Sequence, residues 1–224
     1  MAYTWLFFDA DGTLFDFELA EKLALSSVLL DLGQPLTDET YQNYQGINQE
    51  LWLAFEGGKV SQAEIKTRRF ERWLESVGVQ ADVEKVSGDY LLYLSQQGPL
   101  LENALEVIQT LSRNYKMLLL TNGLKEVQRP RFNASTLKPY MTDIIVSGEV
   151  GFAKPDPRVF ESAFNVAGTP AKKEVLMIGD SLSADIVGGM SYGLDTCWYN
   201  PTKMDSSLPI TYIIDDLRQL LEIL

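Results

Sequence analysis

The chain has 224 residues, of which 46% are hydrophobic and 11% aromatic, so its composition allows a buried core and excludes intrinsic disorder. A formal net charge of −12 argues against nucleic acids and anionic membranes as partners, and no apolar run reaches the ~18 residues of a transmembrane helix. Histidine is absent and Cys197 is the single cysteine, which excludes serine–histidine catalysis, histidine-ligated zinc and an internal disulfide framework.

The first hundred residues begin with one short strand and continue with helices. Residues 4–9 form an apolar run that ends at acidic residues and a glycine, which predicts a buried strand. The capping box Ser61-Gln62-Ala63-Glu64 predicts the start of a helix. Helical patterns are expected over residues 16–32, 37–56, 62–77 and 81–97.

The pattern changes near residue 100, after which strands and helices alternate. Strands are expected over residues 116–121, 144–146, 175–178, 196–199 and 212–214, and helices over 102–113, 157–167, 183–192 and the C-terminus. Such alternation is typical of a parallel sheet covered by helices. The sequence therefore predicts an α/β core formed by residues 1–16 and 98–224, interrupted by an all-helical insert over 17–97.

Polar side chains follow four of the predicted strands. They are Asp9 and Asp11, then Thr121 and Asn122, then Lys154, and finally Asp180 and Asp185. Taken singly, each segment can be explained as an acidic turn, an Asn-Gly turn, a solvated lysine or a helix cap. Because parallel α/β sheets bind ligands beyond the carboxyl ends of their strands, we expect these side chains to meet at one edge.

Carboxylates, one lysine and one hydroxyl suit phosphoryl transfer, which needs positioning and electrostatic stabilisation more than covalent chemistry. Asp9 and Asp180 are expected to bind Mg²⁺, with Mn²⁺ as an alternative ion. The backbone carbonyl of Asp11 would be a third ligand, and Asp185 would hold a metal-bound water.

Asp9 lies at the tip of the first strand and is the candidate nucleophile, because a carboxylate can attack phosphorus and form an aspartyl-phosphate. Asp11 would give a proton to the leaving oxygen and later take one from water. Lys154 and the Thr121 hydroxyl would bind the phosphoryl oxygens.

The order of these motifs resembles the haloacid dehalogenase (HAD) superfamily. The segments that carry the resemblance are Asp9-Ala10-Asp11-Gly12-Thr13-Leu14-Phe15, Thr121-Asn122-Gly123, Lys154-Pro155, and Gly179-Asp180 with Asp185. The resemblance implies the same residue roles, a Rossmann-like parallel sheet core, and an inserted helical cap that closes over the substrate.

Further segments look like the YjjG-type pyrimidine 5'-nucleotidases. They are WLFFDAD at 5–11, NQELW at 48–52, RFERW at 69–73, VGFAKP at 150–155 and CWYN at 197–200. This resemblance implies a pyrimidine nucleoside monophosphate as substrate and a role in nucleotide clean-up.

Aromatic and polar residues recur on one face of the second expected helix: Tyr41, Tyr44, Asn48, Trp52 and Phe55. The face is typical of the core of the insert. The alternative is that one or two of its members line a base pocket and stack on a pyrimidine. Asn48, Trp52 and Arg69 are the candidate substrate-binding residues, although Arg69 also fits a surface position.

Other functions stay open at this point. A phosphatase of the same fold acting on phosphoglycolate or a sugar phosphate is the main alternative. A phosphoglucomutase relative would use a cap histidine, and a dehalogenase proper would lack the second acid, Asp11. A phospho-aspartate switch resembling a response-regulator receiver would have no helical insert.

The lone cysteine and an N-terminus without a secretory pattern predict a cytoplasmic protein. Its expected partner is a small-molecule phosphate monoester.

Overall fold

The computed structural model describes residues 3–224, apart from the side chain of Glu56. The described chain divides into two compact units. One contains the residues up to Phe17 together with Gly98–Leu224, and the other contains Glu18–Gln97.

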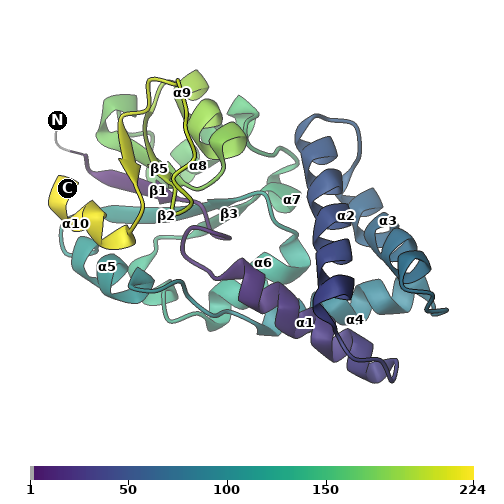
Figure 1. The fold of residues 1–224 in the computed structure, drawn as a ribbon. Helices are drawn as coiled ribbons and strands as arrows, with labels where there is room; N and C mark the ends of the chain where they lie inside the picture. Colours follow the sequence, from purple (N-terminus) through teal and green to yellow (C-terminus); the bar gives the residue numbers. More distant parts are fainter. Residues whose placement is uncertain (1–2) are drawn as a thin grey trace. The chain divides into compact units, whose positions relative to one another are not determined.

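The first unit is built on a six-stranded parallel sheet (Figure 1). Its strands are β1 (Trp5–Phe8), β2 (Lys116–Thr121), β3 (Ile144–Val146), β4 (Val175–Gly179), β5 (Asp195–Tyr199) and β6 (Tyr212–Ile214). The strand order is β3-β2-β1-β4-β5-β6, so β1 lies between β2 and β4, with Trp5 opposite both Lys116 and Val175. The predicted α/β fold with a parallel sheet is confirmed.

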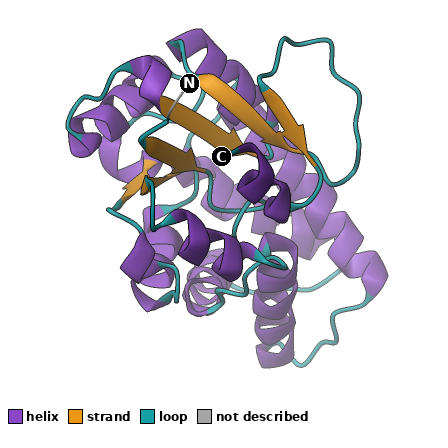
Figure 2. Ribbon diagram, turned by 90° about the vertical axis from the view of Figure 1, so that its left-hand side faces the viewer, coloured by secondary structure: helices purple, strands orange, loops and turns teal. Residues whose placement is uncertain are grey.

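Helices cover both faces of this sheet (Figure 2). They are α5 (Ala104–Leu111), α6 (Lys125–Ala134), α7 (Ser147–Val150), α8 (Pro157–Ala167), α9 (Gly188–Tyr192) and α10 (Leu220–Ile223). Successive residues of β1 point to opposite faces, so Phe8 packs in one core cluster with α5 while Phe7 packs in another with α8. Both faces of β1 are therefore buried, which explains its continuous apolar sequence.

Two segments of the first unit differ from expectation. Helix α6 was not predicted, because Pro130 interrupts its pattern and removes one backbone donor. The helix expected over 183–192 is divided into a π-helical turn (Leu182–Val187) and the short α9.

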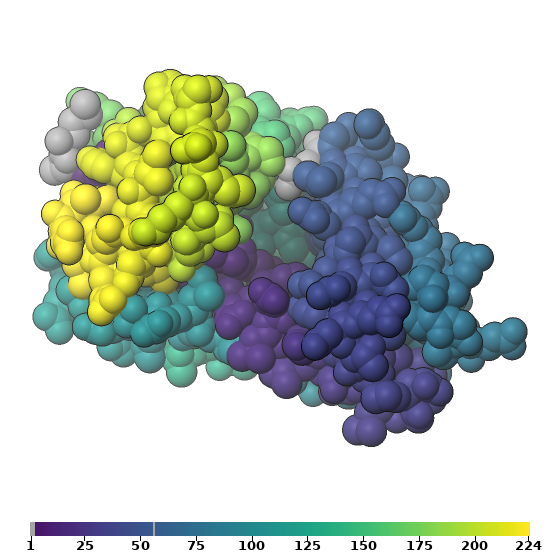
Figure 3. Space-filling view, viewed as in Figure 1, coloured from purple at the N-terminus to yellow at the C-terminus, as the bar shows by residue number. Residues whose placement is uncertain are grey.

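The C-terminal end of the chain lies on the surface of the first unit beside α5, as the yellow and teal atoms show (Figure 3). There the hydroxyl of Tyr115 donates a hydrogen bond of 2.5 Å to the carbonyl of Leu224.

The second unit consists of the helices α2 (Asp38–Glu56), α3 (Gln62–Ser76), α4 (Val83–Gln96) and most of α1 (Phe17–Asp31). Thr37 and Ser61 cap α2 and α3 through complete capping boxes, and the box predicted at 61–64 is confirmed. Aromatic rings fill the interior, with centroids 5.3 Å apart for Tyr44 and Trp73 and 5.1 Å apart for Phe70 and Tyr90. The role of this unit as a cap over substrate stays a prediction. None of the helices in the described chain combines the length and hydropathy that a bilayer crossing requires.

Candidate active site

Asp9 occupies the first position beyond β1, the strand between β2 and β4. Its backbone N–H donates to the carbonyl of Ile178 in β4 at 2.8 Å, which continues the sheet pairing by one residue. Its side chain is buried, so the carboxylate is held in a largely water-free position at the carboxyl edge of the sheet.

Lys154 brings its charge directly to this carboxylate. Its Nζ lies 2.5 Å from Asp9 Oδ1 and 2.6 Å from Asp185 Oδ1, and only 2% of the lysine is exposed. The alternative explanation of Lys154 as a solvated surface lysine is therefore wrong. A buried lysine between two carboxylates forms a charge-assisted pair with each of them.

Asn122 holds the loop that carries Lys154. Its Nδ2 donates to the Lys154 carbonyl at 2.8 Å, and its Oδ1 accepts from the Lys154 N–H at 2.7 Å. These bonds give the Asn122 side chain a supporting task, and its contact with substrate stays a prediction.

Asp180 follows β4 and completes a group of three carboxylates. One oxygen from each of Asp9, Asp180 and Asp185 lies within 4.8 Å of the others. Thr13 donates to Asp180 Oδ1 at 3.1 Å, and Trp198 in β5 donates to the Asp180 carbonyl at 2.8 Å.

Gly12 makes room for Asp180. The backbone of Gly12 has φ +79°, and a Cβ at this position would lie 2.6 Å from Asp180 Oδ2. Any other residue would therefore bring both a strained backbone and a clash with a carboxylate of the group.

The three carboxylates carry more negative charge than Lys154 can balance. Burial raises the pKa of Asp9 well above its usual range; Lys154 opposes this rise, while Asp185 and Asp180 add to it. Burial and then Asp185 raise the pKa of Asp180 to about 7, against the lowering effect of the Thr13 hydrogen bond. Burial would lower the pKa of Lys154, but Asp185 and Asp9 raise it above its ordinary value, so the lysine stays charged.

This donor set fits a hard divalent cation. Magnesium prefers oxygen ligands, and a doubly charged ion would remove the like-charge repulsion that raises the pKa of Asp9 and Asp180. The carboxylate of Asp11 is not in the group, and ligation by the Asp11 backbone carbonyl stays a prediction.

Asp11 instead faces α6, a helix that was not predicted from the sequence. Its Oδ2 accepts from Gln128 Nε2 at 2.5 Å, and its Oδ1 accepts from the guanidinium of Arg131. A signal was present, because Gln128 and Arg131 are three residues apart and so share one face of any helix that follows Thr121-Asn122-Gly123.

Thr121 ends β2 and is buried, with its Oγ1 accepting the backbone N–H of Gly123 at 3.1 Å. Its hydroxyl hydrogen is therefore still available as a donor to a phosphoryl oxygen.

The other predicted substrate contacts belong to the second unit. Asn48 is buried, donates to Glu21 at 3.0 Å and accepts from Arg69 at 3.4 Å. Arg69 is 2% exposed, so its alternative placement on the surface is wrong. Trp52 is partly buried and contacts Phe55 edge to face.

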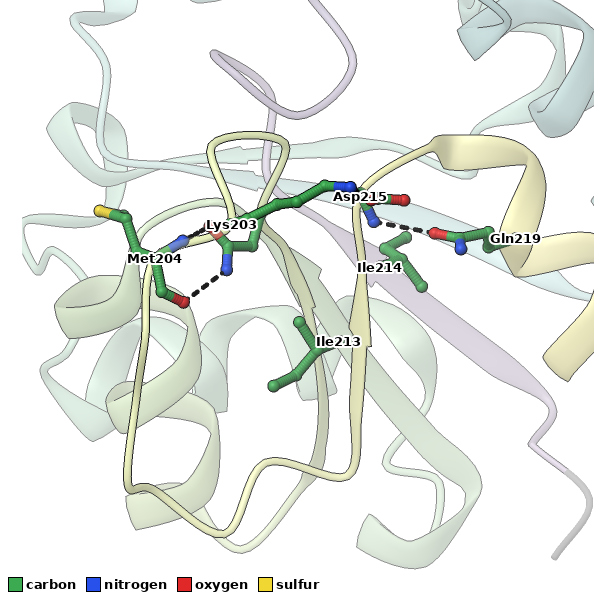
Figure 4. A pocket seen from close by; sticks show the side chains of 7 residues that line it. Lys203, Met204, Ile213, Ile214, Asp215 and Gln219 are labelled. Atoms are coloured by element: carbon green, nitrogen blue, oxygen red, sulfur yellow. Dashed lines mark hydrogen bonds and ion pairs between the residues drawn. The ribbon is translucent and has the colours of Figure 1, made fainter.

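The first unit also has a hollow of about 290 Å³, which lies between strand β6 and the loop that follows β5 (Figure 4). Its lining residues are Asn200, Lys203, Met204, Ile213, Ile214, Asp215 and Gln219. Lys203 pairs with Asp215 at 2.8 Å across it. Asn200 of the CWYN segment lines this hollow, but none of the polar residues predicted beyond the four strands does. The candidate active site is therefore the group of side chains at the carboxyl edge of the sheet.

A match to the haloacid dehalogenase-like hydrolase family covers residues 3–193. The chain belongs to this family. The predicted membership, and with it the assignment as a hydrolase, is confirmed.

Curated relatives align along essentially the whole chain. The pyrimidine 5'-nucleotidase YjjG of Escherichia coli is 32% identical over 100% of this chain and 99% of its own length. The pyrimidine 5'-nucleotidase PynA of Streptococcus pneumoniae is 35% identical over 100% and 96%. The expected resemblance to pyrimidine 5'-nucleotidases is thus confirmed at the level of sequence.

A solved structure matches as well. The crystal structure of YfnB from Bacillus subtilis, described as a HAD-hydrolase bound to magnesium, has a TM-score of 0.92 and 38% identity, and the match covers 100% of this chain and 99% of that one.

Proposed function

We propose that this chain is a Mg²⁺-dependent phosphoric monoester hydrolase that acts through an aspartyl-phosphate at Asp9 on a pyrimidine nucleoside 5'-monophosphate. The observation that carries the proposal is the contact of Lys154 with Asp9 and Asp185 inside a group of three carboxylates, of which these two are buried and Asp180 is partly buried. The magnesium in the related YfnB structure supports the choice of ion, and Mn²⁺ is expected to replace it.

In the first step an oxygen of Asp9 attacks phosphorus and the bond from phosphorus to the leaving oxygen breaks. Asp11 gives that oxygen a proton, so the nucleoside leaves as an alcohol. In the second step water attacks phosphorus, Asp11 takes the proton from the water, and the bond between phosphorus and Asp9 breaks. Inorganic phosphate leaves, and both aspartates return to their starting states.

The neighbouring groups bind and orient the phosphoryl group. Lys154 and Thr121 donate to its oxygens, and the backbone N–H groups beyond β2, including that of Asn122, are further candidate donors. Asp9, Asp180 and Asp185 would hold the divalent ion, which when bound offsets the repulsion between Asp9 and an anionic substrate.

The second unit supplies the proposed recognition of the base. Trp52 is partly buried and offers a ring for stacking, which is worth roughly 1–3 kcal/mol per base. Asn48 lines a hollow of about 390 Å³ together with Glu21, Gln45 and Gln49, a set of amides and one carboxylate that suits a base edge with both donors and acceptors. Arg69 orients the Asn48 amide through a hydrogen bond of 3.4 Å to its oxygen.

Release of phosphate from a panel of monophosphates tests the substrate. UMP and dTMP are expected to give a kcat/KM well above that of phosphoglycolate and sugar phosphates, in Mg²⁺ and not in EDTA. Equal turnover of phosphoglycolate would replace the nucleotidase with the alternative phosphatase. Absence of turnover on every monoester, including p-nitrophenyl phosphate, would favour a phospho-aspartate switch.

A further inference from the structure

Asp11, Gln128 and Arg131 form a closed ring of hydrogen bonds. The guanidinium Nη2 of Arg131 donates to Asp11 Oδ1 and, at 2.9 Å, to Gln128 Oε1. Gln128 Nε2 donates to Asp11 Oδ2 at 2.5 Å, so both carboxylate oxygens are held from α6. Because Gln128 Oε1 faces a guanidinium, its amide has one favourable orientation, in which it donates to Asp11.

Arg131 is buried and pairs with Asp11. Its side chain is 1% exposed, and Asp11 is its only ion-pair partner among the residues that the structure describes. Its Nε and Nη1 have no hydrogen-bond partner within the described part of the chain. The guanidinium also lies over the ring of Phe15, 4.8 Å from its centroid, so it contacts both ends of the 11–15 segment.

Gly123 leaves space for the side chain of Gln128, the third member of the ring. A Cβ at this position would lie 2.1 Å from Gln128 Nε2, so no larger residue fits there without moving Gln128. The glycine of the Thr121-Asn122-Gly123 segment thus serves the orientation of Asp11 as well as the turn after β2.

We propose that Arg131 and Gln128 are positioning residues that hold the Asp11 carboxylate in one orientation for its proton transfers. This inference rests on the proposed function, in which Asp11 serves as acid and base. A carboxylate held at both oxygens keeps a fixed direction, and a small misplacement of a catalytic group is costly in rate. Neither residue needs to touch the substrate for this effect.

The test is a mutant cycle of Arg131→Met and Asp11→Asn, with Arg129→Met as the matched control. Arg129 lies on the same helix but pairs with Asp143 and Glu149 instead. The kcat and KM are measured for UMP, whose alkoxide leaving group needs a proton, and for p-nitrophenyl phosphate, whose leaving group needs it far less. Thermal unfolding of each variant reports the fold.

Arg131→Met is expected to lower kcat for UMP by on the order of 10–100-fold, less than the ~10²–10⁴-fold contribution of a general acid or base because Asp11 itself is still present, and to lower it less for p-nitrophenyl phosphate. KM should change little, and Arg129→Met should behave as the unmodified chain. In the Asp11→Asn background the same change should cause almost no further loss, because both act through one group. Arg131→Lys should recover only part of the rate, since a point charge cannot complete the ring.

Two results would overturn the inference while leaving the proposed function intact: full activity in Arg131→Met, or losses from Arg131→Met and Asp11→Asn that multiply independently. Full activity in Asp11→Asn would instead remove Asp11 from the proposed mechanism. If Arg131→Met does not fold, Gln128→Met enters the same cycle, because it breaks the ring and keeps the ion pair.

Discussion

The three-carboxylate group should make the metal-free protein less stable as the pH rises. The pKa of Asp180 is raised from 3.8 to about 7. Between these two pH values the folded state holds a proton on Asp180 that the unfolded state has already lost. The favourable contribution is complete below pH 4 and is lost as the pH rises through about 7. At about 1.4 kcal/mol for each pH unit this amounts to roughly 4 kcal/mol as an upper limit, and the raised pKa of Asp9 acts in the same direction.

The assay is thermal or urea unfolding between pH 5 and 8, in EDTA and in saturating Mg²⁺. In EDTA the midpoint should fall across this range, by up to roughly 10 °C at about 2–4 °C per kcal/mol for a chain of this size. Mg²⁺ should restore stability most at pH 8, where protons no longer compete for the ligands, by about 2.7 kcal/mol at a hundred times its Kd. Asp180→Asn should flatten the profile in EDTA. Asp216→Asn, at a partly exposed helix cap where the Arg218 hydrogen bond holds the pKa of the carboxyl below its ordinary value, should leave the slope of the profile unchanged. A midpoint that stays level or rises in EDTA would refute the reasoning.

Three further changes test single contacts of the site. Asp9→Asn should abolish turnover with an unchanged circular dichroism spectrum, because an amide is no nucleophile; retained activity would remove Asp9 from that role. Gly12→Ala should weaken Mg²⁺ binding and lower kcat at least tenfold, since its Cβ would lie 2.6 Å from Asp180 Oδ2; a titration of activity against Mg²⁺ measures this, and an unchanged titration contradicts it. Asn122→Ala should cost about 1–3 kcal/mol in urea unfolding and lower kcat, because it frees the Lys154 backbone; unchanged stability would show that the two bonds contribute nothing.

The sheet could be predicted because its strands are short, apolar and followed by polar residues. The strand limits 116–121 and 144–146 agree with β2 and β3, where burial on both faces gives a continuous apolar run that is too short for a helix. The meeting of Asp9, Lys154 and Asp185 was also accessible, since the carboxyl ends of parallel strands share one edge.

The surroundings of Asp11 could not be read in the same way. Gln128 and Arg131 lie 117 and 120 residues from Asp11 in the chain, and the helix that carries them contains Pro130. In the second unit, helical spacing identified the face that carries Tyr44 and Trp52, but spacing does not say which member is buried. Burial of Arg69 depends on Asn48 and on the rings of Phe70 and Tyr90, contacts between helices that no local pattern encodes.

The division of charge explains how two aspartates only two residues apart can take the different tasks proposed for them. Asp9 belongs to a group of three carboxylates with one lysine, two of them buried and Asp180 partly buried, and a divalent cation would balance the excess negative charge of this set. Asp11 has its own buried cation, Arg131, which balances the charge of the Asp11 carboxylate outside that group whenever Asp11 has given up its proton. A cation bound by the three carboxylates would therefore attract the Asp11 side chain only weakly. Asp11 can then stay beside α6 and keep its proposed role in proton transfer. Loss of Arg131 would remove this separation, so the proton transfers proposed for Asp11 depend on the charge of a residue on α6.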